Sequence, residues 1–273
     1  MNSNEEAGRC LSVLIAAYNE QDTIATVLER VLTLPMVKEV IVVDDGSRDA
    51  TARVVSELGH RRVTLLSQPH NMGKTAAIAR ALEVATGEVI IIQDADLEYD
   101  PSEIPGVIEP ILKGHADVVY GSRFMVKRAT RVLYYYHYIA NSVLTALCNV
   151  FTNMNMSDIE TGYKAFRASV IKGIPLTSSG FGMEVEITAS LAQLPIRVYE
   201  VPISYYGRTY EEGKKIALKD GVAALYYILY YNTLGNHTRA RKQYRSLVRG
   251  RLEAQRRSKS ASDSDVKLVE RSA

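Results

Sequence analysis

The stretch Glu88-Val-Ile-Ile-Ile-Gln-Asp-Ala-Asp-Leu-Glu98 joins an apolar strand directly to three acidic side chains at alternate positions. In extended or gently turning backbone, residues i, i+2 and i+4 point to one side, so Asp94, Asp96 and Glu98 can converge. Two like charges about 4 Å apart repel by on the order of 4 kcal/mol at an effective dielectric of about 20, so a counter-charge is expected. The pattern predicts a site for a hard divalent cation and a diphosphate, while the simpler interpretation is a solvated acidic loop.

The composition is that of an ordinary globular protein. The 273 residues are 47% apolar and 23% charged, enough for one large α/β domain, and the net charge of +2 does not indicate a nucleic-acid-binding protein. Cys10 and Cys148 lie far apart, so neither a disulfide framework nor a structural zinc site is expected. The first residues lack the pattern of a secretory signal, and we therefore expect a cytoplasmic protein.

Short runs rich in Val and Ile alternate with segments of helical periodicity, which predicts an α/β fold with a mostly parallel, doubly wound sheet. We expect strands at 11–17, 39–43, 63–66, 89–92 and 117–120, and helices at about 22–34, 49–58 and 74–85. In such sheets ligands bind beyond the carboxyl ends of the strands. Polar groups stand at three of these ends: Tyr18-Asn-Glu20, Asp44-Asp-Gly-Ser47 and residues 94–98.

The second half of the chain differs in character. Residues 131–151 and 216–232 are tyrosine-rich and predict amphipathic helices, but neither offers the roughly 20 uninterrupted apolar residues that span a bilayer. Because tyrosine favours the headgroup level, contact with a membrane surface is one interpretation, and packing on the sheet or on a partner subunit is the other.

The last segment is basic. From Arg239 to Lys259 the chain carries nine Lys or Arg residues against the single acidic residue Glu253. We expect a domain at 1–235 and a basic, partly disordered tail at 236–273. A polybasic segment gains about 1 kcal/mol per cationic side chain at an anionic membrane. A solvated extension and RNA binding are the alternatives.

Seven short motifs stand along the chain in a recognisable order. They are Ala16-Ala-Tyr-Asn-Glu20, Val42-Val-Asp-Asp-Gly-Ser47, Asn71-Met-Gly-Lys74, Gln93-Asp-Ala-Asp-Leu-Glu98, Gly121-Ser-Arg123, Asp158-Ile-Glu-Thr-Gly-Tyr-Lys-Ala-Phe-Arg167 and Glu200-Val-Pro-Ile203. Together they resemble family 2 glycosyltransferases of the GT-A fold, and more narrowly the polyprenyl-phosphate (dolichyl-phosphate) mannosyl- and glucosyltransferases. The resemblance covers roughly residues 10–232. Ala16-Ala17 departs from it, because these enzymes often have Pro-Thr before Tyr-Asn-Glu.

The resemblance implies a donor half of the site. Base and ribose of a nucleoside diphosphate would be held by Ala16, Tyr18, Glu20 and Asp45, with Asp44 able to share that role. Lys74 would face the diphosphate at the start of a helix. A Walker loop is excluded there, because its first glycine would fall at Gln68.

The metal and the loop over the diphosphate follow from the same resemblance. Asp94, Asp96 and Glu98 would hold Mg²⁺ or Mn²⁺, with Glu98 standing where related synthases often carry Gln. Arg208 and Lys214 resemble residues of a mobile loop that closes over the diphosphate, although a solvated charged loop is the simpler interpretation.

The acceptor half is implied with alternatives. Arg123 resembles the arginine that meets the acceptor phosphate, and either Arg131 or Arg128 would be a second clamp. Further acidic residues near the acceptor are as compatible with structural as with catalytic roles, namely Asp158, Glu160 and Glu184.

The implied activity is metal-dependent, inverting transfer of a hexose from a nucleoside diphosphate sugar to a polyprenyl phosphate at the cytoplasmic membrane face. UDP-glucose is slightly favoured and GDP-mannose is next. Asp96, Arg123 and Arg208 would be the catalytic residues. A phosphate acceptor is already anionic near neutral pH and needs no strong base, whereas a sugar-hydroxyl acceptor, the alternative, would need one. A non-catalytic nucleotide-sugar-binding scaffold on the membrane is the alternative of another class, and a homo-oligomer is compatible with the sequence.

Overall fold

The computed structural model describes residues 8–125, 134–207 and 218–270. Its centre is a seven-stranded sheet of order β3-β2-β1-β4-β6-β5-β7. All neighbouring strands run parallel except β6, which is antiparallel to both β4 and β5. The strands are β1 (Leu11–Ala17), β2 (Val37–Asp44), β3 (Val63–Ser67), β4 (Val89–Ile92), β5 (Val118–Ser122), β6 (Lys164–Arg167) and β7 (Val198–Pro202).

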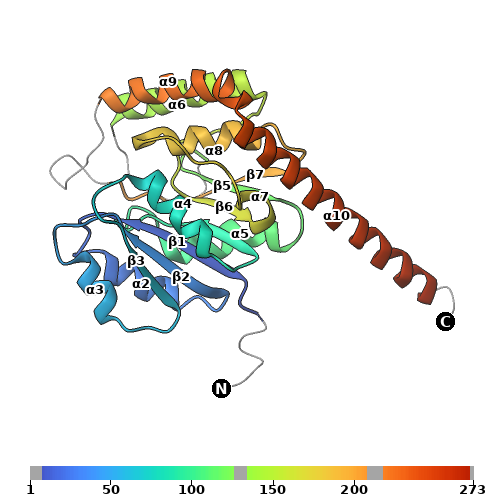
Figure 1. Cartoon of the computed structure of the whole chain (residues 1–273), viewed down its shortest axis with the longest axis horizontal. Helices are drawn as coiled ribbons and strands as arrows, with labels where there is room; N and C mark the ends of the chain where they lie inside the picture. Colours follow the sequence, from blue (N-terminus) through green and yellow to red (C-terminus); the bar gives the residue numbers. More distant parts are fainter. Residues whose placement is uncertain (1–7, 126–133, 208–217, 271–273) are drawn as a thin grey trace.

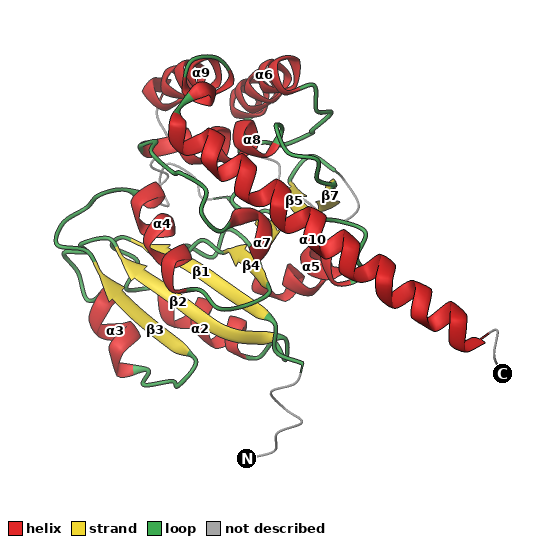
Figure 2. Cartoon of the chain, turned by 45° about the vertical axis from the view of Figure 1, so that its right-hand side comes forward, coloured by secondary structure: helices red, strands yellow, loops and turns green. Residues whose placement is uncertain are grey.

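Helices cover both faces of this sheet (Figures 1 and 2). The first helices of the chain are α2 (Ile24–Leu32), α3 (Thr51–Glu57), α4 (Lys74–Val84), α5 (Ile104–Leu112) and α6 (Tyr135–Thr152). The later ones are α7 (Ala168–Ile171), α8 (Met183–Leu191), α9 (Leu218–Asn232) and α10 (Arg239–Glu270), with short 3₁₀ turns at Pro101–Glu103, Gly180–Gly182 and Gly235–His237.

Side chains that alternate along the central strands form two cores. In β1, Val13 and Ile15 point to the core shared with α2 and α5, while Leu14 points to the core shared with α4, α8 and α9. All three side chains have no exposed surface, and burying one such side chain contributes about 1.5–3 kcal/mol. Burial on both faces explains why these strands are almost continuously apolar.

The predicted mostly parallel α/β sheet is confirmed, and so are its five predicted strands, with bounds that shift by a few residues at most. Two strands were not predicted. β6 is only four residues long and carries Lys164 and Arg167 at its ends, and β7 contains Glu200, so neither shows the apolar run by which the others are recognised.

The tyrosine-rich segments form α6 and α9, which lie side by side at one end of the molecule with α8 beneath them (Figures 1 and 2). Leu144 and Cys148 of α6 and Ile228 of α9 are buried on the inner side. The outer side carries exposed apolar residues instead, including Tyr136, 83% exposed, and Val150, 79% exposed. Among the described helices, none combines the length and apolar character needed to cross a bilayer.

The basic segment differs from the expected loose tail, because residues 239–270 form the helix α10, which is long enough to project past the sheet (Figure 1). Its first half packs on the domain through Tyr244, Val248 and Leu252, which recur every four residues and are buried. The expected boundary at residue 235 therefore falls before a stretch that belongs to the core of the domain.

Several arginines of α10 bind backbone carbonyl groups of the domain. Arg251 donates to the carbonyl oxygen of Lys172 (3.0 Å), at the end of α7, and Arg249 donates to that of Gln193 (3.1 Å), just past the end of α8. The last carbonyls of a helix have no partner within the helix and carry its partial negative charge. Part of the positive charge of this segment thus serves to fasten the helix to its own domain.

Candidate active site

The site lies at the edge where β1, β2, β4 and β5 have their carboxyl ends. Because β6 is antiparallel, it begins at this same edge: its first residue, Lys164, pairs with Ile92 at the end of β4 and with Tyr120 of β5. The segment 157–163, which precedes β6, therefore lies at the site. The sheet thus brings together the loops that carry most of the predicted residues.

The loops after β1 and β2 are fastened to each other. The backbone nitrogen of Asn19 donates to Ser47 Oγ (3.0 Å), and the Asn19 side chain accepts from the nitrogen of Arg48 (2.9 Å). Asn19 has φ of +54°, which asparagine tolerates better than most residues. This turn leaves Tyr18 partly exposed beside the loop of Asp44, so two predicted nucleotide-binding segments are neighbours. Ala16, at the end of β1, is also partly exposed, as is Glu20.

Asp45 has a structural partner for each carboxylate oxygen. Oδ1 accepts from the nitrogen of Met72 (2.7 Å) and Gln68 Nε2 (3.0 Å), and Oδ2 accepts from the nitrogen of Gly73 (2.8 Å). Asp45 thereby fixes the loop that leads into α4 and places Lys74 at its start. Its predicted contact with a ribose or base stays a prediction. Its neighbour Asp44 is also buried.

Lys74 lies between two carboxylates. Its Nζ is 2.7 Å from Asp94 Oδ1 and 3.5 Å from Glu184 Oε1. Burial alone would lower the pKa of Lys74, but the charges of Asp94 and Glu184 outweigh it and hold this pKa well above its usual range. The charged form of Lys74 is therefore strongly favoured.

The three predicted metal ligands have different partners in this structure. Asp94 binds Lys74, Asp96 Oδ1 accepts from the nitrogen of Glu98 (3.1 Å), and Glu98 Oε2 accepts from the hydroxyl of Tyr205 (2.7 Å). Within the described ranges, no group of three or more His, Cys, Asp or Glu side chains is arranged to hold a metal. The donor set, carboxylate oxygens that follow one strand end, nevertheless has the chemistry that Mg²⁺ and Mn²⁺ prefer.

Arg123 is held by Asp158. Its Nε and Nη2 donate to the two carboxylate oxygens, each at 2.7 Å, and its backbone nitrogen also donates to Oδ2 (3.1 Å). Asp158 has no exposed surface, while 12% of the Arg123 side chain is exposed. Asp158 therefore acts in this structure as the partner that orients Arg123. The other predicted cationic residues, Arg128, Arg131, Arg208 and Lys214, lie outside the described residues.

Three further residues shape the site and were not given roles from the sequence. Glu200 accepts from the backbone nitrogens of Ser157 (2.9 Å) and Asp158 (3.2 Å), so it positions the partner of Arg123. Its place in the Glu200-Val-Pro-Ile203 motif was the available signal. Tyr205 binds Glu98, and its ring lies 5.2 Å from the guanidinium carbon of Arg123. Gly162 packs on the carboxylate of Asp94, where an added Cβ would lie 2.4 Å from Oδ2.

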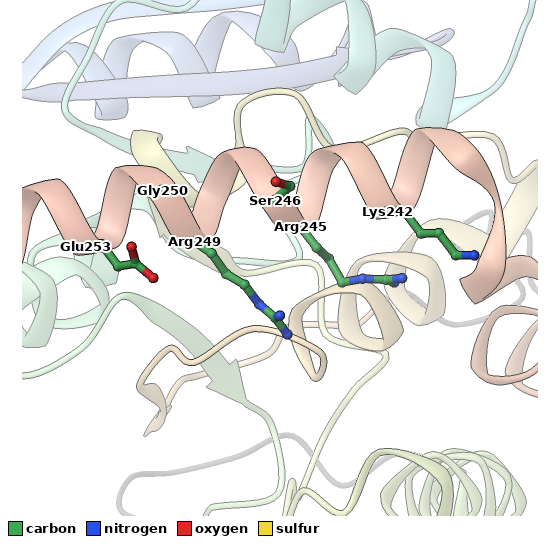
Figure 3. Close-up of a pocket in the computed structure, with 6 residues that line it drawn as sticks. All are labelled: Lys242, Arg245, Ser246, Arg249, Gly250 and Glu253. Carbon is green, nitrogen blue, oxygen red and sulfur yellow. The ribbon is translucent and has the colours of Figure 1, made fainter.

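A separate groove runs along α10, away from the strand ends (Figure 3). Lys242, Arg245 and Arg249 project from one side of the helix there, together with Glu253. Arg245 donates to the carbonyl oxygen of Asn236 (3.0 Å). Since Arg249 binds the domain as well, two of the three cations lining this groove already have partners in the chain.

The mostly parallel sheet with its antiparallel strand β6 and its flanking helices has the architecture of the GT-A glycosyltransferases. The chain belongs to glycosyl transferase family 2, whose model matches residues 12–174.

Two curated relatives are similar over three quarters of this chain. The undecaprenyl-phosphate 4-deoxy-4-formamido-L-arabinose transferase of Edwardsiella ictaluri is 30% identical over 211 residues, which cover 75% of this chain and 62% of the relative. The dolichol-phosphate mannosyltransferase of Pyrococcus furiosus is 28% identical over 209 residues, which cover 75% of this chain and 58% of the relative. The matched regions thus span about three fifths of each relative's length.

A solved structure supports the fold independently. Glucosyl-3-phosphoglycerate synthase from Mycobacterium tuberculosis, solved with Mn²⁺, UDP and phosphoglyceric acid, matches with a TM-score of 0.63 at 21% identity, covering 84% of this chain and 81% of that chain. At this identity the likeness establishes the GT-A architecture.

Proposed function

We propose that this chain transfers a hexose from a nucleoside diphosphate sugar to a polyprenyl phosphate. The observation that carries the proposal is the pairing of Lys74 with Asp94 at the same sheet edge as Arg123, which provides cationic groups for two phosphate-bearing substrates. The Edwardsiella and Pyrococcus relatives are named for transfer to such lipid phosphates. UDP-glucose is the favoured donor and GDP-mannose the next.

In the proposed reaction, an oxygen of the lipid phosphate attacks the anomeric carbon and the nucleoside diphosphate leaves with the electron pair of the broken bond. A single displacement inverts the anomeric centre. Lys74 faces the leaving diphosphate, Arg123 orients the acceptor, and in-line placement supplies much of the rate. Asp94, Asp96 and Glu98 would hold a divalent cation, which neutralises charge on the leaving group when it is bound.

Measuring transfer of labelled sugar to a short-chain polyprenyl phosphate tests this function. We expect EDTA to lower the rate roughly 100-fold or more and Mg²⁺ or Mn²⁺ to restore it, because the cation contributes several kcal/mol. Running UDP-glucose and GDP-mannose side by side identifies the donor. If transfer occurs only to sugar hydroxyl groups, the acceptor is a glycan and the proposal of a lipid phosphate acceptor is wrong. If no transfer occurs to any acceptor, the non-catalytic scaffold is favoured.

The outer face of α6 and α9 is proposed to lie on the membrane that contains the acceptor. Over its 18 residues α6 has no Lys, Arg, Asp or Glu, and residues 221–232 in α9 have none either. Exposed apolar side chains recur along both helices, in α6 at Tyr136, Val143 and Val150 and in α9 at Val222, Tyr226 and Leu229. An uncharged apolar face of this kind is typical of an interaction surface, and tyrosine suits the interface with lipid headgroups.

Replacing Tyr136, Val150 and Tyr226 together by serine is expected to reduce sedimentation with phosphatidylcholine vesicles by roughly tenfold or more, because the apolar area that enters the bilayer is lost. All three side chains are more than half exposed, so the melting temperature should change little. Repeating the sedimentation with vesicles that contain the anionic lipid phosphatidylglycerol measures how much the basic helix α10 contributes to binding, apart from the apolar face.

The matched control replaces three exposed apolar residues elsewhere, Val84, Leu112 and Tyr199, by serine. This variant should bind vesicles as the unchanged protein does. Equal loss of binding in both triple variants would contradict a specific role for the α6 and α9 face.

A further inference from the structure

Glu160 stands between the two halves of the site. It lies two residues after Asp158, which binds Arg123, and two residues before Gly162, which packs on Asp94. The segment that carries it is held at its start by Glu200 and at its end by the hydroxyl of Tyr99, which accepts from the nitrogen of Gly162 (2.8 Å). A group on this segment can therefore reach a substrate that bridges donor and acceptor.

The carboxyl group of Glu160 has an unsatisfied oxygen. Oε1 is buried and has no hydrogen-bond partner within the described part of the chain, while the residue as a whole is partly exposed. Leaving a buried polar atom without a partner costs about 1–3 kcal/mol, and more for a charged group. Because the residue itself is partly exposed, a ligand in the site can give this carboxyl group a hydrogen-bond partner.

The surrounding cations are bound to other groups. Arg123, from the end of β5, makes two hydrogen bonds to Asp158, and Lys74 binds Asp94 and Glu184. Lys164 of β6 donates to the carbonyl oxygen of Thr161, and its ammonium lies 4.9 Å from the centre of the Tyr120 ring. Within the described ranges, each of these three cations thus contacts a group other than Glu160.

The charges that act on Glu160 favour its neutral form. Burial and, after it, the negative charge of Glu184 on α8 together raise the pKa of Glu160 to about 8, against the lowering influence of Lys164 and Arg123. Asp158 adds a smaller contribution in the raising direction. From α6 the neighbour is Cys148, whose pKa is raised to about 12 by burial first and by Glu160 next. These influences together favour the protonated form of the Glu160 carboxyl group near neutral pH.

We propose that Glu160 binds the acceptor phosphate as a neutral carboxylic acid that donates a hydrogen bond, and that it is not the base of the reaction. An ionised carboxylate at this place would repel a phosphate dianion, whereas a protonated one adds a donor beside Arg123. The proton stays on Glu160 throughout, because the phosphate oxygen that attacks the sugar carries no proton to remove. This inference rests on the proposed lipid-phosphate acceptor.

The pH dependence of Glu160→Gln tests the inference, because glutamine keeps the shape and a donor but cannot ionise. For the unchanged enzyme we expect kcat/KM for polyprenyl phosphate to fall about tenfold per pH unit above about pH 8, as Glu160 loses its proton. Glu160→Gln should keep activity within about threefold at pH 7 and lose this alkaline decline. The acceptor itself titrates near pH 6 and does so equally in both enzymes.

A second measurement is independent of catalysis. A carboxyl group whose pKa is higher in the folded than in the unfolded state loses stability as pH rises from its unfolded to its folded pKa. The melting temperature of Glu160→Gln should therefore exceed that of the unchanged protein by an amount that grows between about pH 5 and pH 8. Glu109→Gln, at an exposed position of α5, is the matched control and should show no such trend.

Three outcomes would overturn the inference. Loss of transfer by roughly 1,000-fold in Glu160→Gln at every pH would identify Glu160 as a base. If kcat/KM of Glu160→Gln still declines above about pH 8, the decline arises from another group, such as Lys164, whose pKa is lowered by burial to about 8. A melting-temperature difference that is constant with pH would show that Glu160 is ionised. Failure of the proposed function is distinct from all three, since the unchanged enzyme would then not use polyprenyl phosphate.

Discussion

Replacing Asp96 by asparagine is expected to lower sugar transfer by roughly 100- to 1,000-fold, with no loss of the fold. Asparagine keeps the Oδ1 acceptor for the nitrogen of Glu98, so the turn through Leu97, which has φ of +62°, is retained. What is lost is one negative charge at the place proposed for the cation. The concentration of Mn²⁺ or Mg²⁺ needed for half-maximal rate should rise in parallel.

The control for this substitution is again Glu109→Gln, which removes a carboxylate charge from the surface of α5. Its transfer rate and metal requirement should match those of the unchanged protein. Activity of Asp96→Asn within about threefold of normal would contradict a role for Asp96 at the cation, and a large drop in its melting temperature would point to a structural role.

Arg241→Met is expected to destabilise the protein by about 3–5 kcal/mol, the range found when one partner of a buried ion pair is removed. Arg241 binds the carboxylate of Glu186, and both side chains are almost fully buried. Glu186 also accepts from the backbone nitrogens of Thr177 (2.9 Å) and Ser178 (2.8 Å), so its charge would remain buried without a cation. A melting temperature lower by roughly 10 °C should result.

The exposed Arg257 of the same helix provides the control, because Arg257→Met removes a charge without uncovering a buried partner. That variant should stay within about 0.5 kcal/mol of the unchanged protein. Replacing Glu186 by glutamine in the Arg241→Met background should recover part of the stability, since the unpaired charge is then gone. Equal melting temperatures for Arg241→Met and Arg257→Met would disprove the importance of the pair.

The strands buried on both faces could be predicted because their signal is local. A run such as Val89–Ile92 is apolar at every position, which few other structures tolerate. β6 could not be predicted in this way. It has a polar residue at each end and the buried Ala165 and Phe166 between them, and it pairs with residues of β4 and β5 that lie 44–78 positions away in the sequence.

The sequence relates the residues of the proposed donor half to one another more directly than those of the proposed acceptor half, because their signal is also local. The acidic run after β4 is contiguous, and Lys74 begins α4, which packs against β1, the strand beside β4, so that Lys74 and Asp94 form a 2.7 Å ion pair. The bonds from Arg123 to Asp158 and from Tyr205 to Glu98 join residues 35 and 107 positions apart, and no periodicity relates them.

The basic helix α10 shows that a cationic segment can also bind its own domain. A run of arginines predicts an electrostatic partner, and the membrane was the partner expected here. The competing signal was present in Tyr244, Val248 and Leu252, whose spacing of four marks a buried helix face. Arginine donors that reach carbonyl groups at the ends of α7 and α8 could be recognised only once the helix was placed.

The reversed direction of β6 gives the two proposed halves of the site different supports. The proposed donor contacts lie on loops that leave parallel strands, while the segment 157–163 enters the site ahead of an antiparallel strand and is anchored by Glu200 and Tyr99. Under the proposed function, substitutions within that segment would change which acceptor is bound without shifting the register of any strand.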